Sequence, residues 1–375
     1  MKENAEISFQ ELRLNNSFEW NKKQYKLDDL ERVEVFTENG VYNLNNVKQK
    51  LPESKVFTKK KADEKLLVSY NADNKLNSII IYSGRRSETL AELYARDKYL
   101  VTITDDMIDY NAMEKKFILA EGVSDHADDE IGEGILENVE DVVWPFRLNM
   151  NEPCADYQVV EVSVDFETSF CDHHGGPDQA VEAFAGIMAA TSIKYQQQGL
   201  CRKILVSRLD GYCDIDSDPY AKQVEQNLSG CAGYGLLTYF GEYYNVTHTY
   251  VDRDASLLLS GTGLECETES RCIVGCANIG TLCRKETAYG VTYATFSNSL
   301  NFRSILVAHE LGHVSGANHK LFGSGEYIMA PTIKSFATGF SSKSIRKMNC
   351  YLEESTCPAR LQSKKKTKLS DLLST

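Results

Sequence analysis

Long apolar runs are missing from this sequence. No stretch approaches eighteen consecutive apolar residues, so we expect no membrane-spanning helix. The first residues, MKENAEISFQELRLNN, also lack the apolar segment of a signal peptide. Basic residues are in deficit, because 41 Lys and Arg stand against 54 Asp and Glu and the net charge is −13. A chain with this charge implies no broad basic surface, which argues against nucleic acid as a partner.

Cysteine is absent from the first 153 residues, whereas all eleven cysteines lie between Cys154 and Cys357. This density predicts a disulfide-braced, secreted domain. The cysteines lack paired CxxC spacing, so a cysteine-based zinc module is not favoured. Glycosylation sequons begin at Asn15, Asn227 and Asn245 and agree with secretion. We therefore expect an extracellular protein on the basis of its cysteines rather than of a targeting segment.

The chain is long enough for two domains with a substantial core. Residues 1–150 contain alternating runs, such as VEVFTENGVYNL and NSIIIYSG, that are separated by turn residues. This pattern predicts a mainly antiparallel β domain. Residues 121–141 are acidic and contain no Lys or Arg, which is typical of an exposed linker at the end of that domain.

Strand and helix patterns alternate in residues 151–360. The run VVEVSVDF has the character of a strand, and PDQAVEAFAGIMAATSIKYQQQGL has helical periodicity. This alternation predicts an α/β (α+β) domain with a mixed sheet. Residues 361–375 include the lysine run Lys364–Lys368 and are expected to form a basic, solvated tail.

The most specific motif is HELGHVSGANH, from His309 to His319. His309 and His313 are four residues apart, so on a helix both rings project from one face and can bind the same ion. Gly316 can adopt a left-handed conformation that ends the helix and returns the chain, which delivers His319 as a third ligand. Three imidazoles leave the fourth tetrahedral position open for water, as in catalytic zinc sites.

Two further features complete the motif. Glu310 follows the first histidine and is placed to reach a water at the open position. The segment EYIMAP places Met329 ten residues beyond His319. Together, HExxHxxGxxH and this methionine resemble the metzincin zinc peptidases, and Met329-Ala330-Pro331 looks like the methionine turn of the reprolysin or adamalysin branch. The resemblance implies a metzincin-like catalytic domain with bound Zn²⁺, and it also allows Ca²⁺.

Two more segments are similar to that branch. GCANIGTLC resembles its substrate-pairing edge strand, which implies that Gly275, Ala277, Ile279 and Gly280 bind an extended peptide. Close packing or turns would equally explain these glycines. FSSKSIRKMNCYLEES resembles the C-terminal helix of the branch, whereas Lys320 stands where these enzymes usually have Asp.

These features predict a zinc endopeptidase that acts on proteins or peptides, with Glu310 as general base for a metal-activated water. The cysteine-poor region before it looks like an inhibitory propeptide. Cys154 lies at the predicted junction, where its thiolate could cap the zinc or the residue could pair in a disulfide. The alternative is a non-catalytic binding or adhesion protein that retains the metzincin fold. His173 and His174 suggest either a second metal or a polar loop, of which the loop is favoured.

Overall fold

The structure is a computed structural model. It describes residues 17–20, 23–26, 30–61, 64–70, 76–83, 86–89, 116–118, 154, 156–222, 235–263, 265–268, 271–319, 327–331, 333, 337 and 339–354. The acidic linker and the basic tail predicted from the sequence lie outside these residues.

A seven-stranded mixed sheet forms the centre of the fold, with the order β16-β17-β13-β11-β12-β4-β5. Strands β17, β13, β11, β12 and β4 are parallel, and the edge strands β16 and β5 are antiparallel to their neighbours. The strands span β4 (Phe36–Leu44), β5 (Val47–Gln49), β11 (Gln158–Phe166), β12 (Arg202–Gly211), β13 (Ala255–Ser260), β16 (Gly275–Ala277) and β17 (Tyr289–Tyr293). The mixed α/β fold expected from the sequence is confirmed.

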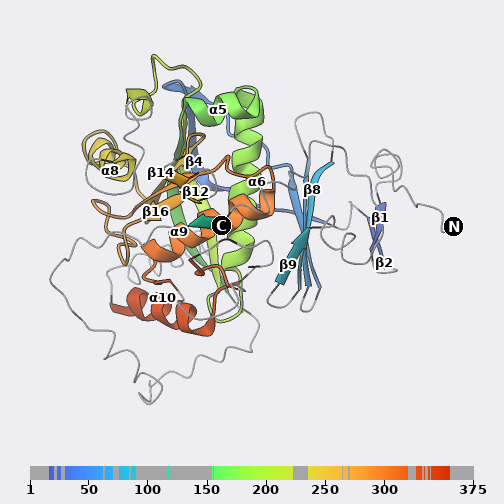
Figure 1. The fold of residues 1–375 in the computed structure, drawn as a ribbon. Coiled ribbons are helices and arrows are strands. Elements are labelled where there is room, and N and C mark those ends of the chain that lie inside the picture. Colours follow the sequence, from blue (N-terminus) through green and yellow to red (C-terminus); the bar gives the residue numbers. More distant parts are fainter. Residues whose placement is uncertain are drawn as a thin grey trace, which may run out of the picture.

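The inner strands carry apolar or small residues on both faces because helices and loops cover both sides of a parallel sheet. All six residues of β13 are buried, as are the last five of β11. Helix α6 (Pro177–Tyr195) packs along β12 and against helix α9 (Leu300–Val314) (Figure 1). The other helices in the described residues are α5 (Thr168–His174), α8 (Leu236–Thr247) and α10 (Ser342–Glu354).

In the part of the chain that the structure describes, three smaller sheets accompany the central one. A five-stranded antiparallel sheet has the order β3-β6-β7-β8-β9, and its strand β6 contacts α6. A two-stranded sheet pairs β1 with β2, and a three-stranded sheet has the order β10-β15-β14. Their bounds are β1 (Ser17–Trp20), β2 (Lys23–Lys26), β3 (Glu31–Arg32), β6 (Val56–Lys61), β7 (Glu64–Tyr70), β8 (Leu76–Ser83), β9 (Arg86–Thr89), β10 (Lys116–Ile118), β14 (Glu265–Thr268) and β15 (Arg271–Ile273).

The N-terminal segment is part of the central sheet, which the predicted boundary at residue 150 did not anticipate. Strand β4 lies parallel to β12, and β5 closes that edge of the sheet. Val33, Val35, Tyr42 and Val56 are buried in the same hydrophobic core as the residues of α6 and α9. An interrupted run of alternating residues cannot reveal whether its partner strand is local or distant, so the sequence indicated only that this segment is a strand.

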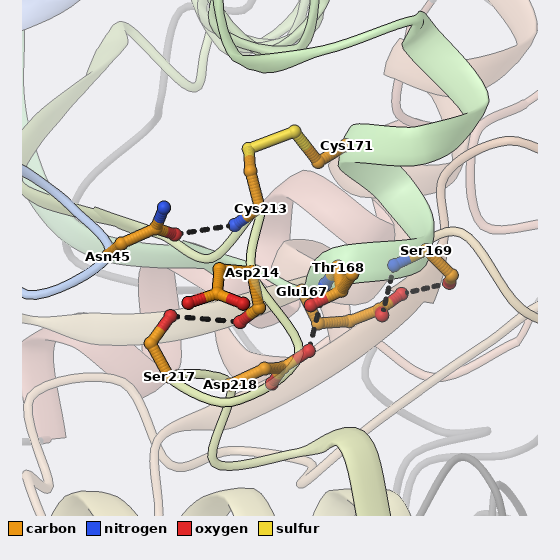
Figure 2. Close-up of a disulfide and its surroundings, with 9 residues drawn as sticks. All are labelled: Asn45, Glu167, Thr168, Ser169, Cys171, Cys213, Asp214, Ser217 and Asp218. Carbon is orange, nitrogen blue, oxygen red and sulfur yellow. Dashed lines mark hydrogen bonds between the residues drawn. A yellow bond between two sulfur atoms is a disulfide. The ribbon is translucent and has the colours of Figure 1, made fainter.

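Polar contacts hold the tip of this N-terminal segment to the end of β12. The Asn43 side-chain amide donates to Asp210 Oδ1 at 2.6 Å. Asn45 donates its backbone N–H to the Gly211 carbonyl at 2.8 Å, and its side-chain oxygen accepts the Cys213 N–H at 2.7 Å. Figure 2 shows the Asn45 side chain directed at Cys213, beside the disulfide between Cys171 and Cys213. This edge of the sheet is therefore covered by the chain's own N-terminal residues.

Disulfides brace the region that was expected to contain them. Cys154 is bonded to Cys201 and Cys171 to Cys213, while Cys276 and Cys283 are also disulfide-bonded. Within the described residues, no helix is both long enough and apolar enough to cross a membrane.

We predict that the N-terminal segment stays bound when the chain is cut between residues 119 and 153. Buried apolar side chains such as Val33, Val35 and Val56 contribute roughly 1.5–3 kcal/mol each, which favours retention of the fragment. The measurement is size-exclusion chromatography after cleavage at a protease site inserted in this stretch. The two fragments should elute together, and Val35→Asp should weaken their association. Separate elution of the wild-type fragments would contradict the integrated strand.

Candidate metal centre

Helix α9 positions the first two histidines. His309 and His313 lie one turn apart on its buried face, and both are fully buried. The helix ends where expected, because Gly316 has a positive φ of 97° and its N–H donates to the His313 carbonyl. The Ala317 N–H then donates to the Gly312 carbonyl at 2.9 Å. This reversal carries His319 back towards the two helical histidines.

The three imidazoles converge through their Nε2 atoms. Nε2 of His309 lies 2.9 Å from that of His313 and 3.0 Å from that of His319, and the third separation is 3.2 Å. Among the described residues, this is the one group of three or more potential ligands whose ligand atoms lie within reach of a single ion. The predicted ligand set is thus brought together by the fold.

The tautomers of the two helical histidines favour metal binding. His309 Nδ1 lies 2.6 Å from the Ile328 carbonyl oxygen, and His313 Nδ1 lies 2.8 Å from that of Ala317. A carbonyl oxygen only accepts, so in the neutral rings each Nδ1 holds the proton and each Nε2 presents a lone pair. Two adjacent lone pairs cannot hydrogen-bond to each other, despite their short separation.

A tetrahedral zinc site fits this donor set. With Zn–N bonds of about 2.0–2.1 Å, tetrahedral ligands lie roughly 3.3 Å apart. The observed Nε2 separations of 2.9–3.2 Å are close to this value. Backbone carbonyls that accept from the other ring nitrogen are the usual supports of metal-bound histidine.

Burial keeps the imidazoles of His309 and His313 neutral. Desolvation is the main cause that lowers the pKa of His309 well below its ordinary value, and the charge of the neighbouring His313 and His319 adds to the effect. The pKa of His313 falls to about 3 for the same reasons, burial first and His319 second. A neutral imidazole is the form that binds a metal.

Glu310 is buried beside the histidines without any hydrogen-bond partner for either carboxylate oxygen among the described residues. Burial alone raises its pKa well above the ordinary value. A buried carboxylate without a partner is costly, and the explanation for it is usually a water, an ion or a catalytic role. A cation bound by the adjacent histidines would favour the ionised form of Glu310.

Two glycines make room around this carboxylate and the methionine. A Cβ at Gly275 of strand β16 would collide with Glu310 Oε1, so β16 approaches the acid as only glycine permits. A Cβ at Gly312 of α9 would collide with the sulfur of Met329. Met329 itself is fully buried in a turn closed by the Ala330 N–H donating to the Tyr327 carbonyl. The structure therefore packs Met329 against the zinc-binding motif.

The four residues predicted to bind substrate have different surroundings. Gly275 and Ala277 lie in β16, which ends the central sheet and has β17 as its strand neighbour in the described part of the chain. Gly280 has a φ of 65° and donates its N–H to the His313 carbonyl, so it caps the end of α9. Ile279 is half-buried between them. An edge strand beside Glu310 suits peptide pairing, which remains a prediction.

Cys154 is not a thiol in this structure. It pairs with Cys201, so of the two alternatives left open by the sequence, the disulfide is correct and the zinc-capping thiolate is wrong. The odd number of cysteines suggested an unpaired thiol but could not identify which residue carried it.

The other histidines and acids do not join the metal centre. His174 Nε2 lies 3.3 Å from the guanidinium of Arg303, and this buried cation opposes a metal beside His173 and His174. Asp218 accepts the backbone N–H of Thr168 (Figure 2). It also accepts the backbone N–H of Tyr220, as a capping residue does. No second metal-binding group is found in the described residues, so calcium is not supported.

A group of three converging imidazoles with an adjacent buried carboxylate is typical of metallohydrolases. The comparison with protein families makes this class specific: the model described as metallo-peptidase family M12B, reprolysin-like, matches residues 225–320. This segment includes all three histidines and Glu310, and it covers about a quarter of the chain. The predicted resemblance to reprolysin-like metzincins is confirmed over this segment. No curated protein matches the chain.

We predict that His309→Ala lowers the zinc content of the purified protein from about one ion per chain to well below it, because one of three ligands is lost. Atomic emission measures this ratio. His173→Ala is the matched control and should keep the wild-type stoichiometry. Equal zinc content in both variants would exclude His309 as a ligand.

A second prediction concerns the buried acid in metal-free protein. Since the folded chain raises the pKa of Glu310 above its ordinary value of 4.5, the folded state retains a proton that the unfolded state releases. The contribution of Glu310 to stability is therefore present below about pH 4.5 and is lost as the pH rises. Glu310→Gln removes this loss, so it should be more stable than wild type at pH 8. Thermal unfolding in chelator should show the difference shrinking towards pH 4.5, and a pH-independent difference would contradict it.

Proposed function

We propose that this protein is a zinc-dependent endopeptidase that hydrolyses peptide bonds in proteins, with Glu310 as the general base. The observation that carries the proposal is the buried Glu310 carboxylate, which has no hydrogen-bond partner among the described residues and lies next to three converging imidazoles. His309, His313 and His319 would hold the zinc. When bound, zinc polarises the scissile carbonyl and lowers the pKa of water towards about 7.

Glu310 has the position and environment of a base. Its carboxylate oxygens are free to accept the proton of an attacking water and then to donate it to the leaving amine. A pKa raised by burial brings the acid closer to the operating pH, which makes both transfers easier. The low-polarity surroundings also strengthen every charge interaction in the site.

Strand β16 supports a peptide-binding role for the same site. Its residues Gly275 and Ala277 pair antiparallel with Thr292 and Gly290 of β17. An extended substrate that adds to the other side of β16 would continue the sheet and pass beside Glu310, which Gly275 touches. Backbone pairing of this kind favours an endopeptidase, because the strand would bind substrate residues on both sides of the cleaved bond.

Latency and secretion complete the proposal. The N-terminal residues precede the peptidase domain and are fastened to it through β4, so in the proposed latent precursor the region that limits access to the site is attached to the domain. Strands β4 and β5 lie at the end of the sheet opposite β16, so these two strands brace the domain and do not themselves block the substrate edge. The disulfides support function outside the cell.

A non-catalytic binding protein that retains the fold is the competing function. Such a protein would not need Glu310, whose burial without a hydrogen-bond partner costs stability. The retained acid therefore favours the peptidase.

Glu310→Gln should keep zinc near the wild-type content and reduce kcat for peptide cleavage by about 10²–10⁴-fold or more, since general base catalysis contributes on this order. Cleavage of a fluorogenic peptide library measures the loss after limited proteolysis of the N-terminal region. Chelator should abolish the wild-type activity and added zinc should restore it. Wild-type turnover by the variant would remove Glu310 from the mechanism, and an inert, zinc-loaded wild type would favour the binding protein.

A further inference from the structure

The orientation of the His309 ring depends on a backbone carbonyl outside helix α9. His309 Nδ1 donates to the Ile328 carbonyl at 2.6 Å, and this bond sets the rotation of the ring and the direction of Nε2. Ile328 adjoins the buried Met329, so its carbonyl is supplied by the turn rather than by α9. Whatever holds Ile328 in place therefore also aims the ring.

Ile328 is held by Gly339. The Ile328 N–H donates to the Gly339 carbonyl at 3.0 Å, next to an isolated parallel bridge between Tyr327 and Gly339. These are the backbone contacts that join the methionine turn to the chain returning towards α10.

The returning chain is in turn clamped by one side chain, that of Gln197. Its Nε2 donates to the Phe340 carbonyl at 2.9 Å, and its Oε1 accepts the Phe340 N–H at 2.7 Å. A Cβ at Gly339 would lie 2.8 Å from Gln197 Oε1, so glycine at this position permits the close approach. A primary amide pairs with the backbone in both directions, whereas a carboxylate would face the Phe340 carbonyl with a second acceptor.

The residues next to Gln197 in the sequence contact both helix α9 and the chain around Phe340. Tyr195, two residues earlier, donates its hydroxyl to the carbonyl of Ala308, the residue before His309, at 3.1 Å. Its ring packs edge-to-face on Phe340 with the centroids 4.9 Å apart. The Gln197 carbonyl accepts the N–H of Cys201, which is bonded to Cys154. Tyr195 at the end of α6 thus contacts α9, which carries His309, and Gln197 two residues later contacts the chain that follows the methionine turn.

We propose that Gln197 is a positioning residue that aims the first metal ligand, His309, through the backbone of Phe340, Gly339 and Ile328. The inference rests on the proposed metal centre and extends it to a residue far from the HExxH motif in sequence. Gln197 does not touch the metal or the substrate. Its effect is to remove rotational freedom from the His309 ring, which raises the affinity of the three-histidine site for zinc.

The test compares Gln197→Met, Gln197→Glu and Gly339→Ala in the full-length chain. The first two remove or reverse the amide clamp, and the third displaces Gln197 by adding a Cβ. Zinc affinity is measured by competition with a chromogenic chelator, and the geometry of the site by the visible absorption spectrum of the Co²⁺-substituted protein. We expect a loss of zinc affinity of about 10–100-fold, typical for supports of metal ligands, with a changed Co²⁺ spectrum in all three variants.

Asn349→Ala is the matched control. Asn349 donates to the Gly199 carbonyl and accepts from Arg202, so it braces the same loop through hydrogen bonds that do not involve residues 328–340. It should lower the melting temperature but leave zinc affinity and the Co²⁺ spectrum as in wild type.

Unchanged affinity and spectrum in the Gln197 and Gly339 variants that fold, or an equal loss in Asn349→Ala, would overturn the positioning role. A wild-type protein that binds no zinc would instead refute the proposed function, so the two failures are distinguishable.

Discussion

The imidazole rings of His309, His313 and His319 direct their Nε2 atoms at one point in the interior of this protein. These three atoms lie 2.9–3.2 Å from one another. The carbonyls of Ile328 and Ala317 fix the proton on Nδ1 of the two helical rings, so their Nε2 lone pairs face each other without a proton between them. A cation relieves this repulsion. Desolvation disfavours the charged form of the buried Glu310, and the same cation would stabilise that form. One bound ion would therefore link the ligand geometry to the acid chemistry of Glu310.

Helices and strands of the fold, as well as loops, position the three histidines and Glu310. Helix α9 presents two ligands and the acid, while β16 approaches Glu310 through Gly275. Helix α6 reaches α9 through Tyr195, and Gln197, two residues beyond the end of α6, bonds Phe340 in the chain that follows the methionine turn. At the opposite edge of the sheet, the N-terminal strand β4 covers β12 and adds to the common core. Such a scaffold suits a site that must hold three ligands to within a fraction of an ångström.

The sequence was informative where chemistry and spacing coincide. The three potential metal ligands could be predicted from the sequence. Helix geometry places His309 and His313 on one face, and the left-handed Gly316 returns the chain so that His319 joins them. Strands such as β11 and β13 were visible as apolar runs. The partner of β4 was not, since a strand's pattern does not encode which distant edge it joins. Gln197 also escaped notice, because a lone glutamine carries no signal and its partners are backbone groups. The pairing of Cys154 depended on a Cα separation from Cys201 that only the folded chain supplies.

Anomalous X-ray scattering from crystals of the full-length protein, recorded on both sides of the zinc absorption edge, tests the central claim most directly. The account predicts one strong peak about 2.0–2.1 Å from Nε2 of His309, His313 and His319. A map with no peak at this position after growth in zinc, or with the ion bound elsewhere, would contradict it.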